Sequence, residues 1–275
     1  MSRIDLHSHS TASDGTLSPT ALVERAHEQG VHMLALTDHD TTAGLDEAVR
    51  AAAEVGIELV PGIELSLRWN KRNMHIVGLA IDPTAPELCR LIQTLTEIRE
   101  ARVARMAQSL SKAGIDGALE GAYRHAAGGV PTRTHFARYL VEQGAAPDVS
   151  SVFKRFLVPG RPGYASTQWP DLADGVAALL AAGGIAVLAH PHSYGWTGAW
   201  SRRILEAFMA CGGRALEVAC GSSNQQSLQT WSGYARRFGL LASMGSDFHS
   251  PGGFIELGRM PRLPQGLAPV WEAWA

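Results

Sequence analysis

Short apolar runs alternate along the chain with longer segments in which apolar residues recur every three to four positions. The short runs are apolar throughout, which is typical of strands buried on both faces of a sheet. Because strands that alternate with helices form parallel sheets covered on both faces, the pattern predicts an α/β parallel barrel of about seven units. The predicted strands lie at residues 3–7, 32–40, 57–66, 74–81, 185–191, 215–220 and 240–249.

Two of the predicted helices have ends that the sequence marks. In the first, Ser18 is the expected N-cap, Pro19 the first helical residue and Gly30 the stop. The second starts in the same way at Asp171 and stops at the glycine pair 183–184. These signals define the first and last residues of two helices that would cover the predicted barrel.

The alternation of strands and helices is interrupted once. A long charged helix and three shorter helical segments follow the fourth strand, without a strand signal among them, at residues 85–114, 117–127, 132–144 and 149–160. We predict that residues 99–163 form a small helical subdomain, inserted into the barrel, that caps the substrate. The barrel itself then consists of residues 1–98 and 164–275.

Composition narrows the class of protein. A chain of 275 residues with 45% hydrophobic residues can bury a full core. Its formal net charge of -2 provides no global basic field, which disfavours binding along extended nucleic acid. Three widely separated cysteines argue against a disulfide framework, and no signal peptide or membrane-length apolar run is present. We therefore expect a cytoplasmic protein without an obligate protein partner.

Potential metal ligands gather at the predicted ends of the strands. His7 and His9 alternate along one strand, so both imidazoles point to the same side and can hold one metal ion. Further candidates follow other strands, whose carboxyl ends would converge on one face of a parallel barrel. One buried histidine is more often a core residue than a metal ligand. Potential ligands occur at five strand ends, however, and such a coincidence favours a shared metal site. A mixed imidazole and carboxylate set predicts catalytic Zn²⁺, Mn²⁺ or Fe²⁺. The further candidates are His39, Glu64, His75, His190, Asp247 and His249.

The segments "HSHSTASDG", "TDHD", the strand with Glu64, "AHP" and "GSDFH" resemble successive motifs of the polymerase and histidinol phosphatase (PHP) family of metal-dependent phosphoesterases. The resemblance extends from Ile4 to about Ser250 and has the motifs in the family's order. It implies a distorted (β/α)7 barrel that holds two or three divalent ions. Among these ions Mn²⁺ is favoured, with Zn²⁺ and Fe²⁺ as alternatives.

The resemblance also implies a ligand set for each ion. The first ion would be held by the expected catalytic residues His7, His9, Glu64 and Asp247, with Glu64 bridging to a second ion held by His75 and His190. The third would be held by Asp14, His39 and His249. Some relatives have histidine at the position of Asp14, and a loop-capping role before Gly15 is its alternative.

Such a cluster suits the hydrolysis of a phosphoester. Closely spaced cations lower the pKa of a bridging water and neutralise charge on the phosphoryl oxygens. The sequence contains no GxSxG elbow, no P-loop and no GxGxxG after a strand. Their absence disfavours a serine hydrolase, a nucleotide triphosphatase and a nicotinamide-dependent enzyme. We therefore expect a metal-dependent phosphatase.

Basic residues of the predicted insertion are candidates for binding the substrate. Guanidinium groups bind phosphate through paired hydrogen bonds, so the insertion could hold a second phosphate while the metal ions act on the first. A solvated helix face is the alternative for any one of these residues. The seven tryptophans are expected to fill the core or cover edges, with a nucleobase platform as the alternative. The candidate substrate contacts are Arg133, His135, Lys154, Arg161 and, outside the insertion, His192.

The overall layout resembles the PHP group that hydrolyses nucleoside 3',5'-bisphosphates, some members of which trim the 5' ends of short RNA. The leading hypothesis is a phosphatase that removes the 3'-phosphate of a small nucleotide such as adenosine 3',5'-bisphosphate. The alternatives are a 5'-3' exonuclease on short RNA or DNA oligonucleotides, a histidinol-phosphate phosphatase, and an inactive metal-binding module. The sequence leaves open the preferred base and sugar, the metal, the general acid and the oligomeric state.

Overall fold

The computed structural model describes residues 3–274. Within them seven strands form one mixed sheet, in the order β1 to β7 along the chain. The first and last strands also approach each other, because Leu6 N–H donates to Met244 O (3.0 Å) and Asp247 N–H donates to His7 O (2.9 Å). The α/β fold with seven strands is confirmed. The strands are β1 (Arg3–Asp5), β2 (Val31–Leu36), β3 (Glu58–Trp69), β4 (Arg72–Leu79), β5 (Ile185–Leu188), β6 (Ala215–Cys220) and β7 (Leu241–Gly245).

The strand β4 departs from the predicted all-parallel arrangement. It pairs antiparallel with both β3 and β5, whereas the other neighbouring strands are parallel. Asn70 and Lys71 join β3 to β4 in a tight turn, with φ angles of 46° and 62°. A two-residue turn can only join antiparallel strands, because a parallel return needs a crossover of a dozen or more residues. The prediction of a fully parallel barrel is therefore wrong at this hairpin.

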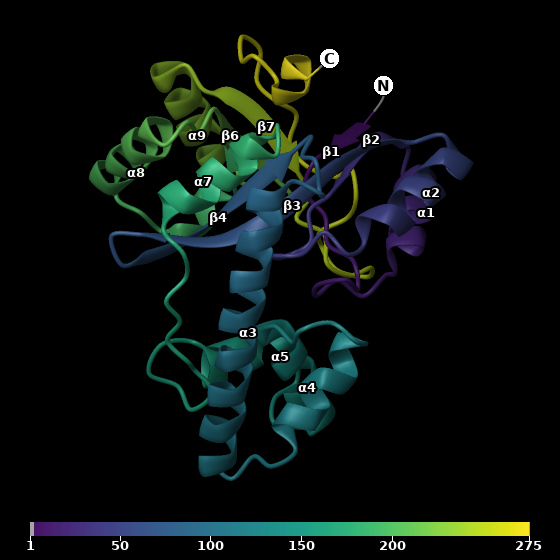
Figure 1. The fold of residues 1–275 in the computed structure, drawn as a ribbon, viewed down its shortest axis with the longest axis vertical. Helices are drawn as coiled ribbons and strands as arrows, with labels where there is room; N and C mark the ends of the chain where they lie inside the picture. Colours follow the sequence, from purple (N-terminus) through teal and green to yellow (C-terminus); the bar gives the residue numbers. More distant parts are fainter. Residues whose placement is uncertain (1–2, 275) are drawn as a thin grey trace.

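Two groups of helices flank the sheet, one on its left and one on its right (Figure 1). Ser18 caps the first helix as predicted, since its side chain accepts a hydrogen bond from Ala21 N–H (3.1 Å). Asp171 precedes α7 without a side-chain capping bond, and its carboxylate pairs with Arg68 instead (3.2 Å). Among the helices of residues 3–274, none combines the length and the hydrophobicity that a membrane span requires. The helices around the sheet are α1 (Pro19–Glu28), α2 (Leu45–Val55), α7 (Leu172–Ala181), α8 (Gly198–Ala210), α9 (Gln225–Phe238) and the short η2 (Pro191–Tyr194) and η3 (Val270–Ala273).

The lower lobe in Figure 1 is helical and has its own apolar core. The helix α3 (Pro86–Lys112) belongs to both lobes: Leu95 packs in the main core, and Leu110 packs with Phe136 and Leu140 in the lower one. We call the lower lobe the cap. Besides the second half of α3 it contains α4 (Ala118–Ala126), α5 (Arg133–Glu142), α6 (Val149–Val152) and η1 (Phe153–Leu157). One continuous helix thus sets the position of the cap relative to the sheet.

Candidate metal centre and substrate cavity

The structure brings the nine predicted metal ligands together. They come from the loops after β1, β2, β5 and β7 and from within β3 and β4. They form four overlapping groups, in each of which the ligand atoms lie within 4.8 Å of one another. One group contains the whole set implied for the third ion, and another contains three of the four residues implied for the first ion. The set implied for the second ion is divided between the two remaining groups, which share Glu64. The groups are His9, Asp14, His39 and His249; His7, Glu64 and His190; His7, His9 and Asp247; and His39, Glu64 and His75.

Glu64 lies fully buried at the middle of this cluster. Its Oε1 lies 3.0 Å from His75 Nδ1 and 2.9 Å from His190 Nε2. Its Oε2 lies 2.8 Å from His39 Nδ1 and 3.4 Å from His9 Nε2. A carboxylate between so many imidazoles is well placed to bridge two cations.

Glu64 and His75 do not occupy strand ends, contrary to the prediction. Glu64 lies within β3, and His75 lies near the start of β4. The hairpin explains why both still reach the centre: His75 pairs with Ser66 in the antiparallel ladder, so it is a diagonal neighbour of Glu64 on the same face.

The donor atoms of this cluster fit divalent cations. Within residues 3–274, buried nitrogen and oxygen atoms of His7, His9, Asp14, His39 and Glu64 lack a hydrogen-bond partner. Buried polar atoms are rarely left without a partner unless an ion or water completes them. Imidazole and carboxylate donors without sulfur suit Mn²⁺, Zn²⁺ or Fe²⁺.

The charges within the cluster keep Glu64 ionised, and burial keeps His9 neutral. Burial alone would raise the pKa of Glu64, but His75, His39 and His7 hold it well below its usual range. Burial, together with His249 and His39, lowers the pKa of His9 to about 3. Both states are those in which these groups bind metal. The pKa of His249, in contrast, is raised to about 10, because Asp14 and Asp247 outweigh the effect of its burial.

Glu217, which the sequence analysis missed, supports two of the ligands. Its Oε1 lies 3.0 Å from His7 Nδ1, and its Oε2 accepts a hydrogen bond from His190 N–H (2.5 Å). His190 has a φ of 27°, a left-handed backbone that a non-glycine residue adopts only when its surroundings hold it. Glu217 therefore fixes the ring of one ligand and the backbone of another. The sequence signal that could have identified Glu217 is its position as the single acidic residue within the apolar strand "ALEVAC".

The cap contacts the metal centre directly through Asp14. Thr132 and Thr134 donate hydroxyl hydrogen bonds to Asp14 Oδ2 (3.0 and 2.9 Å), and Arg138 donates to the Asp14 carbonyl (2.6 Å). Asp14 Oδ1 remains on the side of His249, 3.3 Å from its Nε2. One carboxylate oxygen thus faces the candidate metal ligands, while the other is held by the start of α5.

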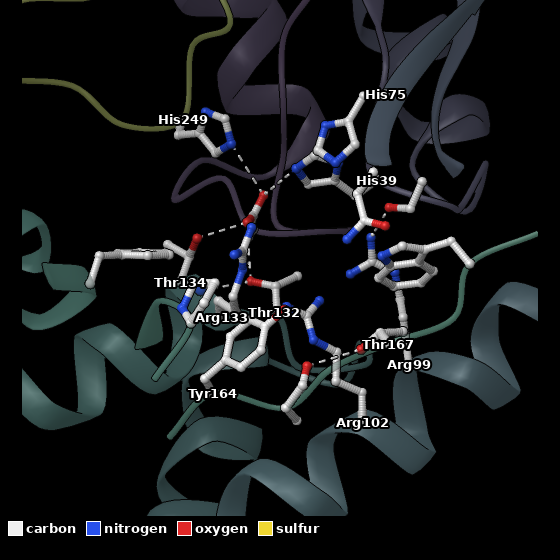
Figure 2. A pocket seen from close by; sticks show the side chains of 17 residues that line it. His39, His75, Arg99, Arg102, Thr132, Arg133, Thr134, Tyr164, Thr167 and His249 are labelled. Carbon is white, nitrogen blue, oxygen red and sulfur yellow. Dashed lines mark hydrogen bonds and ion pairs between the residues drawn. The ribbon is translucent and has the colours of Figure 1, made fainter. Parts of the chain in front are cut away.

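A cavity of about 300 Å³ separates the metal centre from the cap (Figure 2). His39, His75 and His249 line one side, and basic and hydroxyl side chains from the cap lie opposite. The opposite side includes Arg99, Arg102, Thr132, Arg133, Thr134 and Tyr164. The cavity therefore has metal ligands on one wall and hydrogen-bond donors on the other.

The arginines of this cavity are not equivalent. Arg99 is held by Asp40 (2.6 Å) and Ser66 (3.1 Å). Arg102, in contrast, has a buried Nε without a hydrogen-bond partner in the described chain. Burial, together with Arg133 and Arg99, lowers the pKa of Arg102 to about 9, because positive charges are crowded there. An anion in the cavity would relieve that crowding. Arg99 and Arg102 were missed, although their three-residue spacing on one helix is a signal for a shared face.

The other predicted substrate residues lie at varied distances from the cavity. Arg133 lines it. His135 is buried and does not line it. It completes the capping box of α5, where its Nδ1 accepts a hydrogen bond from Thr132 N–H (3.0 Å). Lys154 and Arg161 are exposed and do not line it, and His192 lies in a separate groove, 2.8 Å from Ser222 Oγ. Substrate contact by all five residues stays a prediction.

Comparisons with known proteins find relatives that match nearly the whole chain. The sequence pattern of the PHP domain matches residues 5–185. A 5'-3' exoribonuclease of Haemophilus influenzae is 48% identical over 98% of both chains. A 3',5'-nucleoside bisphosphate phosphatase of Chromobacterium violaceum is 45% identical over 99% of this chain and 96% of the relative. A solved amidohydrolase structure from C. violaceum, with bound sulfate, is 44% identical, covers 98% of this chain and 95% of that one, and superposes with a TM-score of 0.95.

Proposed function

The chain belongs to the PHP domain family, and from that premise we propose that it hydrolyses the 3'-phosphate of nucleoside 3',5'-bisphosphates such as adenosine 3',5'-bisphosphate. The observation that carries the proposal is the cavity with metal ligands on one wall and Arg102 and Arg133 on the other. A substrate with two phosphates matches a cavity with two anion-binding walls. The relative from C. violaceum carries the name of this activity.

The residues of the two cavity walls would have different roles in the reaction. The nine ligands would hold two or three divalent ions, with Mn²⁺ proposed, and bound ions would supply an activated water and neutralise charge on the 3'-phosphoryl group. Arg102 and Arg133 would bind the 5'-phosphate by charge-assisted hydrogen bonds. Holding both ends of the substrate orients the 3'-phosphate toward Glu64 and its histidines, which lowers the entropic part of the barrier.

A 5'-3' exonuclease activity on short RNA is the second candidate, and the same cavity favours it. The first nucleotide of a 5'-phosphorylated RNA also has a 5'-phosphate and a 3'-phosphate, and the latter is esterified to the next nucleotide. The cavity wall at Arg102 would recognise the 5'-phosphate in both substrates. Two relatives, from H. influenzae and Escherichia coli, are named 5'-3' exoribonucleases, and the latter is 46% identical.

Phosphate release by the Mn²⁺-loaded protein tests the proposal. The panel holds adenosine 3',5'-bisphosphate, 3'-AMP, 5'-AMP, histidinol phosphate and a short 5'-phosphorylated RNA. We expect the bisphosphate to be preferred over both monophosphates, because only it engages both walls. Intact bisphosphate beside efficient cleavage of histidinol phosphate would contradict the proposal. Release of mononucleotides from RNA alone would make the exonuclease the main activity.

A further inference from the structure

Two of the candidate ligands face the same oxygen atom of Glu64. His75 Nδ1 lies 3.0 Å, and His190 Nε2 2.9 Å, from Glu64 Oε1. The two rings lie nearly at right angles, with centroids 5.3 Å apart. His75 belongs to β4 and His190 follows β5, so two separate segments must be held in place for both nitrogens to reach this oxygen. We call these three donor atoms the Oε1 site.

The ladder between β4 and β5 ends at His75. Ala189 N–H donates to His75 O (3.1 Å), which is one of the two bonds that a hydrogen-bonded antiparallel pair exchanges. The second bond has a different acceptor, because His75 N–H donates to Tyr194 Oη (2.7 Å). The left-handed backbone of His190 (φ 27°) turns the chain away from the ladder, and the short helix η2 brings Tyr194 back to the strand. The Tyr194 hydroxyl therefore replaces a strand residue as the partner of a ligand's backbone.

The residues at the end of η2 also hold the ring of His190. The Tyr194 ring packs against it, with centroids 5.4 Å apart, and stacks on Trp196 at 4.3 Å. Ser193 Oγ lies 3.1 Å from His190 Nδ1. Because His190 Nε2 faces Glu64, a proton on Nδ1 that donates to Ser193 Oγ would leave Nε2 free to bind a cation. One hydroxyl thus holds the backbone of one ligand, and a second hydroxyl holds the ring of the other.

We propose that Ser193 and Tyr194 are positioning residues for a divalent cation at the Oε1 site. The proposal rests on the metal dependence of the proposed function, but it concerns metal binding and not the choice of substrate. Neither residue lines the cavity between the sheet and the cap. Without the Tyr194 hydroxyl, His75 N–H loses its acceptor and the start of β4 is no longer tied to η2. The two imidazoles then lose their fixed positions around Glu64, and cation affinity falls because outer hydrogen bonds orient the ligands.

Titration of the full-length apoprotein with Mn²⁺ tests the proposal. We expect Tyr194→Phe to weaken the binding of one ion per chain by about 10- to 100-fold, while the other ions bind as in the wild type. Phenylalanine keeps the ring beside His190 and removes only the hydroxyl. Ser193→Ala should weaken the same ion. Tyr139→Phe is the matched control, because Tyr139 is buried in the cap and its hydroxyl also bonds to a backbone atom at 2.7 Å, the Asp116 carbonyl.

Thermal unfolding with and without Mn²⁺ separates metal positioning from fold stability. If Tyr194 only stabilises the fold, Tyr194→Phe lowers the Tm of the apoprotein and of the Mn²⁺-loaded protein by equal amounts. A loss of metal affinity instead widens the difference in Tm from the wild type once Mn²⁺ is added, because a ligand stabilises the folded state according to its affinity. We expect the wider difference for Tyr194→Phe and an equal difference for Tyr139→Phe.

The outcomes distinguish this proposal from the proposed function. Wild-type Mn²⁺ affinities in both variants, or equal Tm differences with and without Mn²⁺, would overturn the positioning role and leave the proposed function standing. Weakened metal binding in a protein that leaves adenosine 3',5'-bisphosphate intact would support the positioning role and contradict only the proposed substrate. A wild-type protein that binds no divalent cation would overturn both. If the Tyr194→Phe apoprotein does not fold, the Ser193→Ala titration decides alone.

Discussion

The two walls of the cavity are built by opposite chemical means. The wall from the sheet presents imidazoles and carboxylates, several with buried atoms that lack a partner in the described chain. The wall from the cap presents guanidinium and hydroxyl donors, and Arg102 there also has a buried atom without a partner. The chemistry of the first wall suits cations, and that of the second wall suits anions. We therefore propose that the ligand is an anion that contacts both the metal ions and the arginines.

Loss of the Glu64 carboxylate, at the centre of the metal wall, should have a greater effect than any other change considered. We expect Glu64→Gln to lower kcat by about 10³-fold or more, because it removes the charge shared by two candidate metal sites. Metal content per chain, measured by elemental analysis, should fall at the same time. Glu58→Gln, at the exposed start of the same strand, is the control. A Glu64→Gln protein with full metal content and full activity would contradict the assigned centre.

The cap wall can be tested without touching the metal centre. Arg102→Ala should raise KM for adenosine 3',5'-bisphosphate by about 10- to 100-fold, since hydrogen bonds to charged groups contribute roughly 1.5–3 kcal/mol. KM for 3'-AMP, which has no 5'-phosphate, should change little. Arg105→Ala is the matched control, because Arg105 is exposed one turn further along the same helix. A parallel rise for both substrates would show that Arg102 does not select the second phosphate.

The sequence predicted the metal wall better than the cap wall, for a physical reason. Every candidate ligand except Asp14 belongs to an apolar strand or follows one within a few residues, so local pattern marks it. Asp14 was identified only through the family resemblance. Arg99 and Arg102 lie on a helix that is charged around most of its surface, and only the crossing of that helix over the sheet decides which arginines face the cavity. That crossing depends on tertiary packing, which the local sequence does not encode.

The antiparallel strand β4, in contrast, was within reach of the sequence. Only residues 67–73 separate the two predicted strands at 57–66 and 74–81, which is too short for a parallel crossover. The repeating alternation elsewhere in the chain led to the uniform parallel prediction. Glu217 could also be singled out as the one acidic residue of an apolar strand. Its role could not be predicted, because its partners His7 and His190 come from distant segments.

Glu217 supports the metal wall from behind, because it contacts His7 and His190 without lining the cavity. Glu217→Gln should weaken metal affinity by about 10- to 100-fold, as the loss of an outer carboxylate does in other metal sites. The effect should appear in a metal titration of the apoprotein and should be overcome by excess Mn²⁺. Equal metal affinity in variant and wild type would assign Glu217 to the stability of the fold alone. Thermal unfolding of both apoproteins separates the two roles.

Asp14 contacts both walls, so variants around it test whether the cap affects metal binding. Thr134→Val removes one of the two cap hydroxyls on Asp14 Oδ2 and keeps the shape of the side chain. We expect metal affinity at the site of Asp14, His39 and His249 to fall by about tenfold, at the lower end of such effects. Thr167→Val is the control, because Thr167 also lines the cavity but bonds only to Ala165 O in the described chain (3.2 Å). Metal titration should then show one weakened ion per chain in Thr134→Val and none in the control. If both variants titrate like the wild type, the cap positions the substrate without influencing the metal ions, and the two walls are independent.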